Sequence, residues 1–272
     1  MVLTITLTAI SLALSGLYAY LFYAYVGSWH AFIAIPLFIP TYIVLFLLWV
    51  AFFILWGKTF NTSKPHKPSA FYYWVLRDAD YVLMFLLNIR IKVRGEHLPK
   101  KTRFALVCNH RSGFDPMIIL KAIKQKPLIF VTKPENMKHP IAGPFIHHAG
   151  FVSVDRSNML EGVKDIERAA SYLKDRECSV GIFPEGTRNM TEEPLLPFHP
   201  GSFRLAQYGE APLVIACLKG SEKIKHRAVF RRTKIYLDIL EIIPEDEVAS
   251  MSTHDLAAHA EKLILEDLQK KE

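Results

Sequence analysis

Apolar residues dominate the first 57 positions of the chain, and no Asp, Glu, Lys or Arg occurs before Lys58. A membrane-spanning helix needs about 20 apolar residues, so this stretch is long enough for two. The natural break is the segment 26–30, which predicts helices over residues 3–26 and 31–56 that form a membrane hairpin. Pro36 and Pro40 fall in the second helix, so the hairpin either spans the bilayer with a kink or enters one leaflet only.

The first 57 residues match neither a cleaved signal peptide nor a soluble helical hairpin well. A signal peptide begins with basic residues and is shorter, whereas this stretch has no basic start. The helices of a soluble hairpin normally carry a polar face, and none is visible here.

Beyond residue 88, short apolar runs alternate with segments of helical periodicity. Apolar residues recur at helical spacing between 155 and 178, and residues 253–270 form an amphipathic pattern that Ser252 and Asp255 open with a capping box. The alternation predicts an α/β fold with a mostly parallel sheet flanked by helices. The expected strands are 89–94, 103–108, 127–132, 151–154, 178–183, 212–218 and 234–243.

The pattern divides the chain into four parts. Residues 1–57 form the membrane-embedded helical hairpin, 58–88 a linker and an aromatic helix, 89–250 the α/β domain, and 251–272 the C-terminal amphipathic helix. The aromatic helix has two possible positions: at the membrane interface, where Trp and Tyr are favoured, or packed on the core of the α/β domain.

Composition and charge narrow the class of protein. The 272 residues are 51% hydrophobic and include three cysteines, which excludes a disordered chain and a disulfide scaffold. The cysteines lie in apolar runs and are expected to be reduced. The net charge of +7 comes entirely from residues 58–272. Basic residues that follow the second apolar helix predict that the charged part lies on the cytoplasmic side of the cell membrane; they are Lys58, Lys64, Lys67 and Arg77.

A first loop with candidate chemistry follows the strand 103–108. It reads Asn-His-Arg-Ser-Gly-Phe-Asp-Pro and contains His110 and Asp115. A bend between the strand and the next helix, expected over 116–124, would bring the carboxylate to the imidazole and leave the other ring nitrogen free as a base. The alternative is that Asp115 only caps that helix, with Pro116 as its first residue, and that His110 is an ordinary polar loop residue.

A second loop follows the strand 178–183 and reads Phe-Pro-Glu-Gly-Thr-Arg. Backbone N–H groups near Gly186 and Thr187 can converge on an anion, and Arg188 adds a bidentate donor. This chemistry suits a phosphate. The alternative is a plain turn with a solvated arginine.

Together the two loops resemble the glycerolipid acyltransferase family, which includes the 1-acyl-glycerol-3-phosphate acyltransferases. Residues 151–156 (Phe-Val-Ser-Val-Asp-Arg) and 211–216 (Ala-Pro-Leu-Val-Ile-Ala) are similar to two further blocks of the family. The resemblance covers roughly residues 90–220 and implies the fold of that family for the α/β domain. The chain departs from the family pattern in the segment 211–216, where Ile-Ala stands in place of a second proline. This difference concerns packing and not catalysis.

The resemblance implies roles for individual residues. His110 would be the general base and Asp115 its orienting partner, while Arg156 and Arg188 would hold the phosphate of the acceptor. The other implied substrate-binding residues are Glu185, Gly186 and Thr187, with Lys133 as an additional phosphate contact. No metal and no bound cofactor are expected, because acyl-CoA or acyl-carrier protein serves as co-substrate.

The implied activity is transfer of an acyl chain from an acyl thioester to 1-acyl-glycerol 3-phosphate, which yields phosphatidic acid for phospholipid synthesis. The expected partners are the lipid acceptor, the acyl donor and an anionic membrane surface, and no nucleic acid. Two alternatives stay open: an acyltransferase for glycerol 3-phosphate or another lysophospholipid, and a non-catalytic lipid-binding membrane module.

Overall fold

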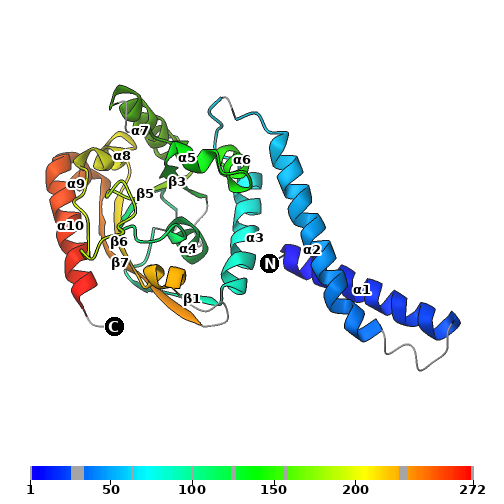
Figure 1. Ribbon diagram of the computed structural model, residues 1–272. Helices are drawn as coiled ribbons and strands as arrows, with labels where there is room; N and C mark the ends of the chain where they lie inside the picture. Colours follow the sequence, from blue (N-terminus) through cyan, green and yellow to red (C-terminus); the bar gives the residue numbers. More distant parts are fainter. Residues whose placement is uncertain are drawn as a thin grey trace. The chain divides into compact units, whose positions relative to one another are not determined.

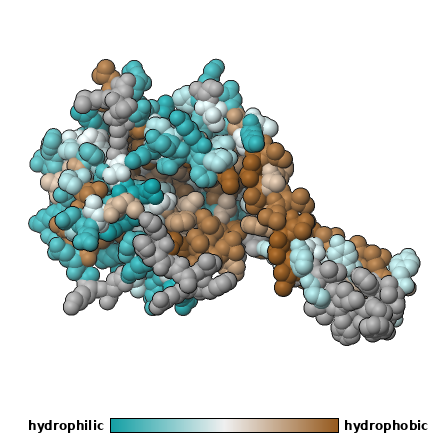
Figure 2. Space-filling model, in the orientation of Figure 1, coloured by the Kyte–Doolittle hydropathy of each residue, from teal (hydrophilic) through white to brown (hydrophobic). Residues whose placement is uncertain are grey.

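The computed structural model describes residues 2–25, 34–62, 64–99, 101–123, 127–155, 159–226 and 232–270. The chain divides into an N-terminal unit, Met1–Asn61, and a C-terminal unit, Thr62–Glu272. Hydrophilic side chains cover much of the visible face of the C-terminal unit, whereas apolar side chains dominate the helices of the N-terminal unit (Figure 2).

The N-terminal unit consists of two long helices, α1 (Val2–Tyr25) and α2 (Ala34–Lys58), that pack against each other. The predicted break at 26–30 lies outside the described residues. Helix α2 continues through Pro40. Ile5–Tyr25 and Ile39–Lys58 are long and apolar enough to cross a membrane, and the most apolar window of the second has no buried residue. Such exposure of large apolar side chains suits lipid better than water.

The C-terminal unit is built on one seven-stranded sheet in the order β1-β7-β6-β2-β5-β3-β4 (Figure 1). All neighbouring pairs are parallel except β6 and β7, which are antiparallel. Each expected strand is present with small shifts of its ends. The strands are β1 (Ile89–Gly95), β2 (Ala105–Cys108), β3 (Leu128–Thr132), β4 (Val152–Ser153), β5 (Ser179–Ile182), β6 (Leu213–Lys219) and β7 (Thr233–Ile243).

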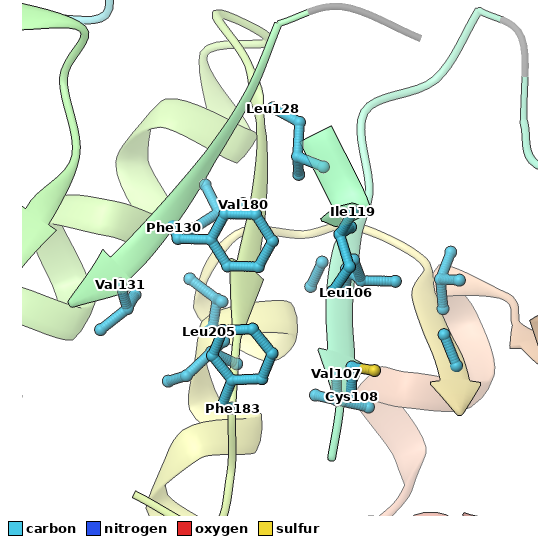
Figure 3. Packing of buried hydrophobic residues seen from close by; sticks show 14 of the residues in the cluster. Leu106, Val107, Cys108, Ile119, Leu128, Phe130, Val131, Val180, Phe183 and Leu205 are labelled. Atoms are coloured by element: carbon cyan, nitrogen blue, oxygen red, sulfur yellow. The ribbon is translucent and has the colours of Figure 1, made fainter. Parts of the chain in front are cut away.

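Helices cover both faces of the sheet, so the central strands β2, β5 and β6 are buried along their whole length (Figure 1). Residues from the two faces form one continuous apolar core, part of which appears in Figure 3. The helices are α3 (Ala70–Leu86), α4 (Asp115–Ala122), α5 (Pro134–Met137), α6 (Ala142–His148), α7 (Met159–Lys174), α8 (Arg204–Tyr208), α9 (Glu245–Ser250) and α10 (Thr253–Gln269), with short 3-10 turns at Pro200–Phe203 and Ser221–His226.

Two predicted helices have informative contacts. In α10, the Ser252 hydroxyl accepts from the Asp255 backbone N–H at 3.1 Å, as the capping pattern indicated. Helix α3, the aromatic helix, packs on α4, α6 and β1 and buries Tyr73 and Met84. Its other face stays exposed and carries Phe71, Trp74, Phe85 and Leu86. The helix therefore packs on the domain and also presents an aromatic surface.

Candidate active site

The sheet topology brings the two predicted loops together. Strands β2, β5 and β3 are parallel neighbours, so the loops that follow them leave the same edge of the sheet. The loop after β2 carries His110, the loop after β5 carries residues 183–188, and Lys133 follows β3 directly. Segments more than 70 residues apart in the sequence thus meet at one edge.

His110 and Asp115 form a close pair. The ring Nδ1 of His110 lies 2.8 Å from Oδ2 of Asp115, whose side chain is completely buried. An ionised carboxylate only accepts hydrogen bonds, so Nδ1 carries the proton and the lone pair is on Nε2. The His110 side chain is 16% exposed, so the imidazole is within reach of a substrate.

The expectation that Asp115 caps the following helix is wrong. Helix α4 begins at Asp115, one residue earlier than expected, and its N-cap position is Phe114, which makes no side-chain cap. The Asp115 carboxylate turns back to accept from the backbone N–H groups of Arg111 and Ser112, each at 2.8 Å. These two bonds close the loop around the carboxylate and aim it at His110.

Glu185 holds the backbone of His110 in place. It is 3% exposed, and its two carboxylate oxygens accept from the backbone N–H of His110 at 2.5 Å and of Leu196 at 3.0 Å. Burial raises the pKa of Glu185, and these two N–H donors act in the opposite direction. The geometry gives Glu185 a positioning role in the His110 loop.

Two aromatic rings pack in a stack beneath the imidazole. The ring of Phe183 lies 4.1 Å from the His110 ring, centroid to centroid, and nearly parallel to it. Phe130 stacks in turn on Phe183 at 5.3 Å (Figure 3). The stack fixes the plane of the imidazole through packing from strands β3 and β5.

Basic and hydroxyl groups stand beside this pair. Lys133 Nζ donates to Thr187 Oγ1 at 3.3 Å. Arg188 is exposed, and a methyl group added to Gly113 would lie 3.4 Å from its Nη1, so the guanidinium lies next to the His110 loop. Gly186 has a φ of +73°, which a glycine adopts without strain. The structure thus places Arg188 next to the His110 loop and Lys133 on Thr187 of the neighbouring turn, whereas Arg156 lies outside the described residues.

Three residues that support the site were not among the predicted site residues. The buried amide of Asn109 accepts from the Leu218 N–H at 2.7 Å and donates to the Leu218 carbonyl at 2.9 Å, which fastens the end of β2 to β6. Arg111 donates to the Glu193 carbonyl at 3.0 Å, and Asn189 donates to the same carbonyl at 2.8 Å. The sequence signal for Asn109 was its place in the Asn-His pair; Arg111 and Asn189 gave none.

The part of the chain that the structure describes holds no group of three or more His, Cys, Asp or Glu side chains in a position to bind a metal ion. The side chains described at the site are a base, a positioning carboxylate and nearby cations. This arrangement can deprotonate a hydroxyl and hold an anion beside it.

Comparison with known proteins gives the site a context. The family model described as "Acyltransferase" matches residues 90–219. The 1-acyl-sn-glycerol-3-phosphate acyltransferase of Bacillus subtilis is 31% identical over an alignment that covers 66% of this chain and 89% of that protein. The enzyme of the same description from Saccharomyces cerevisiae is 26% identical, over 72% of this chain and 66% of its own length. The chain thus spans slightly less than two thirds of that yeast relative.

A solved structure shares the fold. The crystal structure of the 1-acyl-sn-glycerophosphate acyltransferase from Thermotoga maritima superposes with a TM-score of 0.58 and 23% sequence identity, over 72% of this chain and 78% of the other. The mostly parallel sheet with flanking helices is therefore an architecture known from that protein.

Proposed function

The chain belongs to the acyltransferase family, and we propose that it transfers an acyl chain from an acyl thioester to the free hydroxyl of 1-acyl-glycerol 3-phosphate, forming phosphatidic acid. The observation that carries the proposal is the His110–Asp115 pair at 2.8 Å, with Arg188 beside the His110 loop and Lys133 bonded to Thr187 of the neighbouring turn. The substrates named for the Bacillus and yeast relatives suit such a site, because the acceptor combines a hydroxyl with a phosphate.

The reaction needs one base and no covalent intermediate. Nε2 of His110 takes the proton of the acceptor hydroxyl as its oxygen attacks the thioester carbonyl. The carbon–sulfur bond then breaks, and the thiolate leaves with the proton that His110 returns. Asp115 stabilises the imidazolium that exists between these two steps, since it accepts from Nδ1 throughout.

The cysteines do not compete for the role of nucleophile. Cys108, Cys178 and Cys217 are free and buried. Burial raises the pKa of Cys178 to about 12 and that of Cys108 well above its ordinary value. Neither thiol supplies a thiolate near neutral pH, which supports direct transfer of the acyl group.

The cations would bind the acceptor. Its phosphate is attached two carbons from the reacting hydroxyl, so it must lie close to His110. Arg188, whose guanidinium lies next to the His110 loop, and Lys133, which donates to Thr187, would bind it together with Gly186 of the same turn. Arg156, at the end of the segment 151–156, would complete the phosphate contacts. Acyl-CoA or acyl-carrier protein would supply the acyl group, and no resident cofactor takes part.

The enzyme would work at a membrane, because one of its substrates is a lipid. The two apolar helices would anchor it, and the exposed aromatic face of α3 would rest at the headgroup level, where Trp and Phe are favourable. Basic residues after α2 would keep the catalytic unit on the cytoplasmic side and attract anionic lipid.

A panel of acceptors tests the assignment. Membranes that contain the full chain are given one thioester and, in turn, 1-acyl-glycerol 3-phosphate, glycerol 3-phosphate and a lysophospholipid with a larger head group. We expect the highest kcat/KM with 1-acyl-glycerol 3-phosphate. A higher value with another acceptor would support the alternative acceptor, and the absence of any thioester consumption would support a non-catalytic lipid-binding module.

A further inference from the structure

A second basic pocket lies away from His110, in the same C-terminal unit. Its volume is about 380 Å³, and it is lined by residues 62 and 64–66 of the linker together with residues of α5, α6 and α7. Five of its side chains are basic and none is a carboxylate among the described residues that line it: Lys64, His66, Lys138, His147 and Arg168. The function proposed above makes no use of this pocket.

The wall formed by the linker is firmly packed. Tyr172 donates a hydrogen bond from its hydroxyl to the carbonyl of His66 at 3.3 Å. Pro68 sits so close to Gly150 that an added methyl group would lie 2.5 Å from its Cα, and Gly150 has a φ of +89°. The linker is thus held on α7 and on the end of α6, which makes the pocket a built feature of the unit.

Three histidine rings lie close together at one side of the pocket. The ring of His66 lies 4.5 Å from that of His148 and 6.4 Å from that of His147. Burial lowers the pKa of His147, and the charges of His148 and His66 lower it further. One cation is already paired, since Arg168 contacts Asp165 on its own helix at 2.9 Å. A bound anion would accept hydrogen bonds from the lysine ammonium groups and from imidazole N–H groups.

The position of the pocket relative to the strands of the sheet indicates which substrate carries the anion that it binds. Lys138 ends α5, the short helix that comes after β3, and Ser153, which also lines the pocket, ends β4. Neighbouring strands lie about 4.8 Å apart, so β4 is roughly 14 Å from β2, whose end carries His110. The phosphate of the acceptor, two carbons from its hydroxyl, cannot reach that far while the hydroxyl is at His110.

The acyl donor has a phosphate at a greater distance. In acyl-CoA and in acyl-carrier protein alike, a long pantetheine arm separates the thioester from a phosphate. We propose that the pocket of Lys64, His66, Lys138 and His147 binds this pantetheine phosphate while the thioester lies at His110. The inference rests on the proposed acyl transfer and adds to it a binding site for the donor.

The proposal is tested by removing the charge of the donor phosphate and, separately, the charges of the two lysines of the pocket. The donors are an acyl-4′-phosphopantetheine and the matching acyl-pantetheine, which differ only in the phosphate. The variant is Lys64→Gln/Lys138→Gln in the full chain. The control is Lys92→Gln/Lys262→Gln, which removes two exposed lysines outside the pocket. Arg168 is left intact because of its pair with Asp165.

In the wild type and the control, we expect loss of the phosphate to raise the KM for the donor by about tenfold or more, because a charge-assisted contact is lost. In the pocket variant, the phosphorylated donor should already have the higher KM, and loss of its phosphate should change little. The KM for the lipid acceptor and kcat should stay near wild type, since the contact exists in the ground state. An equal phosphate effect in variant and wild type, or a rise in the KM of the acceptor instead, would overturn the proposal.

A binding measurement keeps this test separate from the proposed function. Calorimetric titration of 4′-phosphopantetheine into the full-length His110→Ala protein needs no turnover. We expect binding that the Lys64→Gln/Lys138→Gln changes weaken by about tenfold and that the control changes leave intact. Binding without any acyl transfer in the wild type would contradict the proposed function only, whereas absence of binding would contradict the pocket.

Discussion

Asp115 is the residue on which the geometry of the site depends most. One of its carboxylate oxygens accepts from the ring of His110 and from two backbone N–H groups, all at 2.8 Å. The carboxylate thereby orients the imidazole and holds the loop that carries it. It is also completely buried, so its charge acts on the imidazole with little screening by water.

The change Asp115→Asn tests this double role. A neutral amide stabilises the imidazolium poorly, so we expect kcat to fall by about 10²-fold or more, with the fold retained by circular dichroism. Asp255→Asn, which alters the exposed cap of α10, is the matched control and should keep full activity. Turnover of the Asp115 variant close to that of the control would exclude an orienting role.

For individual residues, the sequence predicted the identity of the contacting residues better than the geometry of their contacts. The spacing of His110 and Asp115 allowed their contact only if the chain turned, and a cap on the helix was the alternative. The turn depends on two backbone N–H groups that point at the carboxylate, and no residue type reveals such a direction. The bond of Glu185 to the His110 backbone was hidden for the same reason.

Among the elements, strands β3 and β5 position the catalytic loop through a close contact. Gly181 of β5 leaves room for the ring of Phe130 from β3, and a side-chain methyl at Gly181 would collide with that ring. Because Phe130 stacks on Phe183 and Phe183 on His110, the absence of a side chain at Gly181 indirectly determines the position of the His110 imidazole.

The change Gly181→Ala should therefore impair both stability and activity. Overpacking of this kind costs about 1–3 kcal/mol, and displacement of the stack should lower kcat more than it raises either KM. Gly201→Ala is a fitting control, since nothing lies within 4 Å of a methyl group added there. Thermal unfolding and steady-state rates measure the two effects. A Gly181 variant as stable and active as the Gly201 variant would show that the stack tolerates displacement.

The elements themselves were largely predictable. Most strands are short apolar runs, and the buried runs in β2, β5 and β6 are the kind that parallel sheets require. The order of the strands and the antiparallel pairing of β6 with β7 were not predictable, because both depend on contacts between distant segments. Local periodicity carries no record of such contacts.

For the whole molecule, a partly buried ionic network joins strands β1, β7 and β6, at one end of the sheet, to the last helix. Asp238 of β7 contacts Arg94 of β1 at 2.6 Å and Lys219 of β6 at 3.3 Å, and Lys219 contacts Asp267 of α10 at 2.7 Å. Burial alone would raise the pKa of Asp238, but Arg94 and Lys219 outweigh it, so the pKa is lowered. The network links β1, β6, β7 and α10 by charge as well as by packing.

A lowered pKa in the folded state predicts a dependence of stability on pH. The stabilisation is complete above the unfolded pKa of about 4 and is lost as the pH falls through the lower folded value. Asp238→Asn should cost about 1–3 kcal/mol at pH 7, less than a fully buried pair because Arg94 is partly exposed. Thermal unfolding of the full chain in detergent should show a difference from wild type that is constant between pH 7 and 5 and narrows below about 4. A difference that grows toward acid would reverse the assigned sign.

The first 57 residues, which carry no charged side chain, have a role in the function proposed for the whole molecule. An enzyme that combines a water-soluble thioester with a lipid must hold its site at the interface, and two apolar helices followed by basic residues can do so. The sequence predicted these helices from composition alone. Whether they cross the bilayer depends on their depth in lipid, which composition does not encode.

The most direct test of the account compares acyl transfer by the wild type with that by His110→Ala. Membranes with equal amounts of each protein receive a labelled acyl thioester and 1-acyl-glycerol 3-phosphate, and labelled phosphatidic acid is measured. His139→Ala, which removes an exposed histidine outside the site, is the control. We predict full product formation by the wild type and the control and none above background by His110→Ala. Phosphatidic acid formed by His110→Ala at a rate near that of the control would contradict the account.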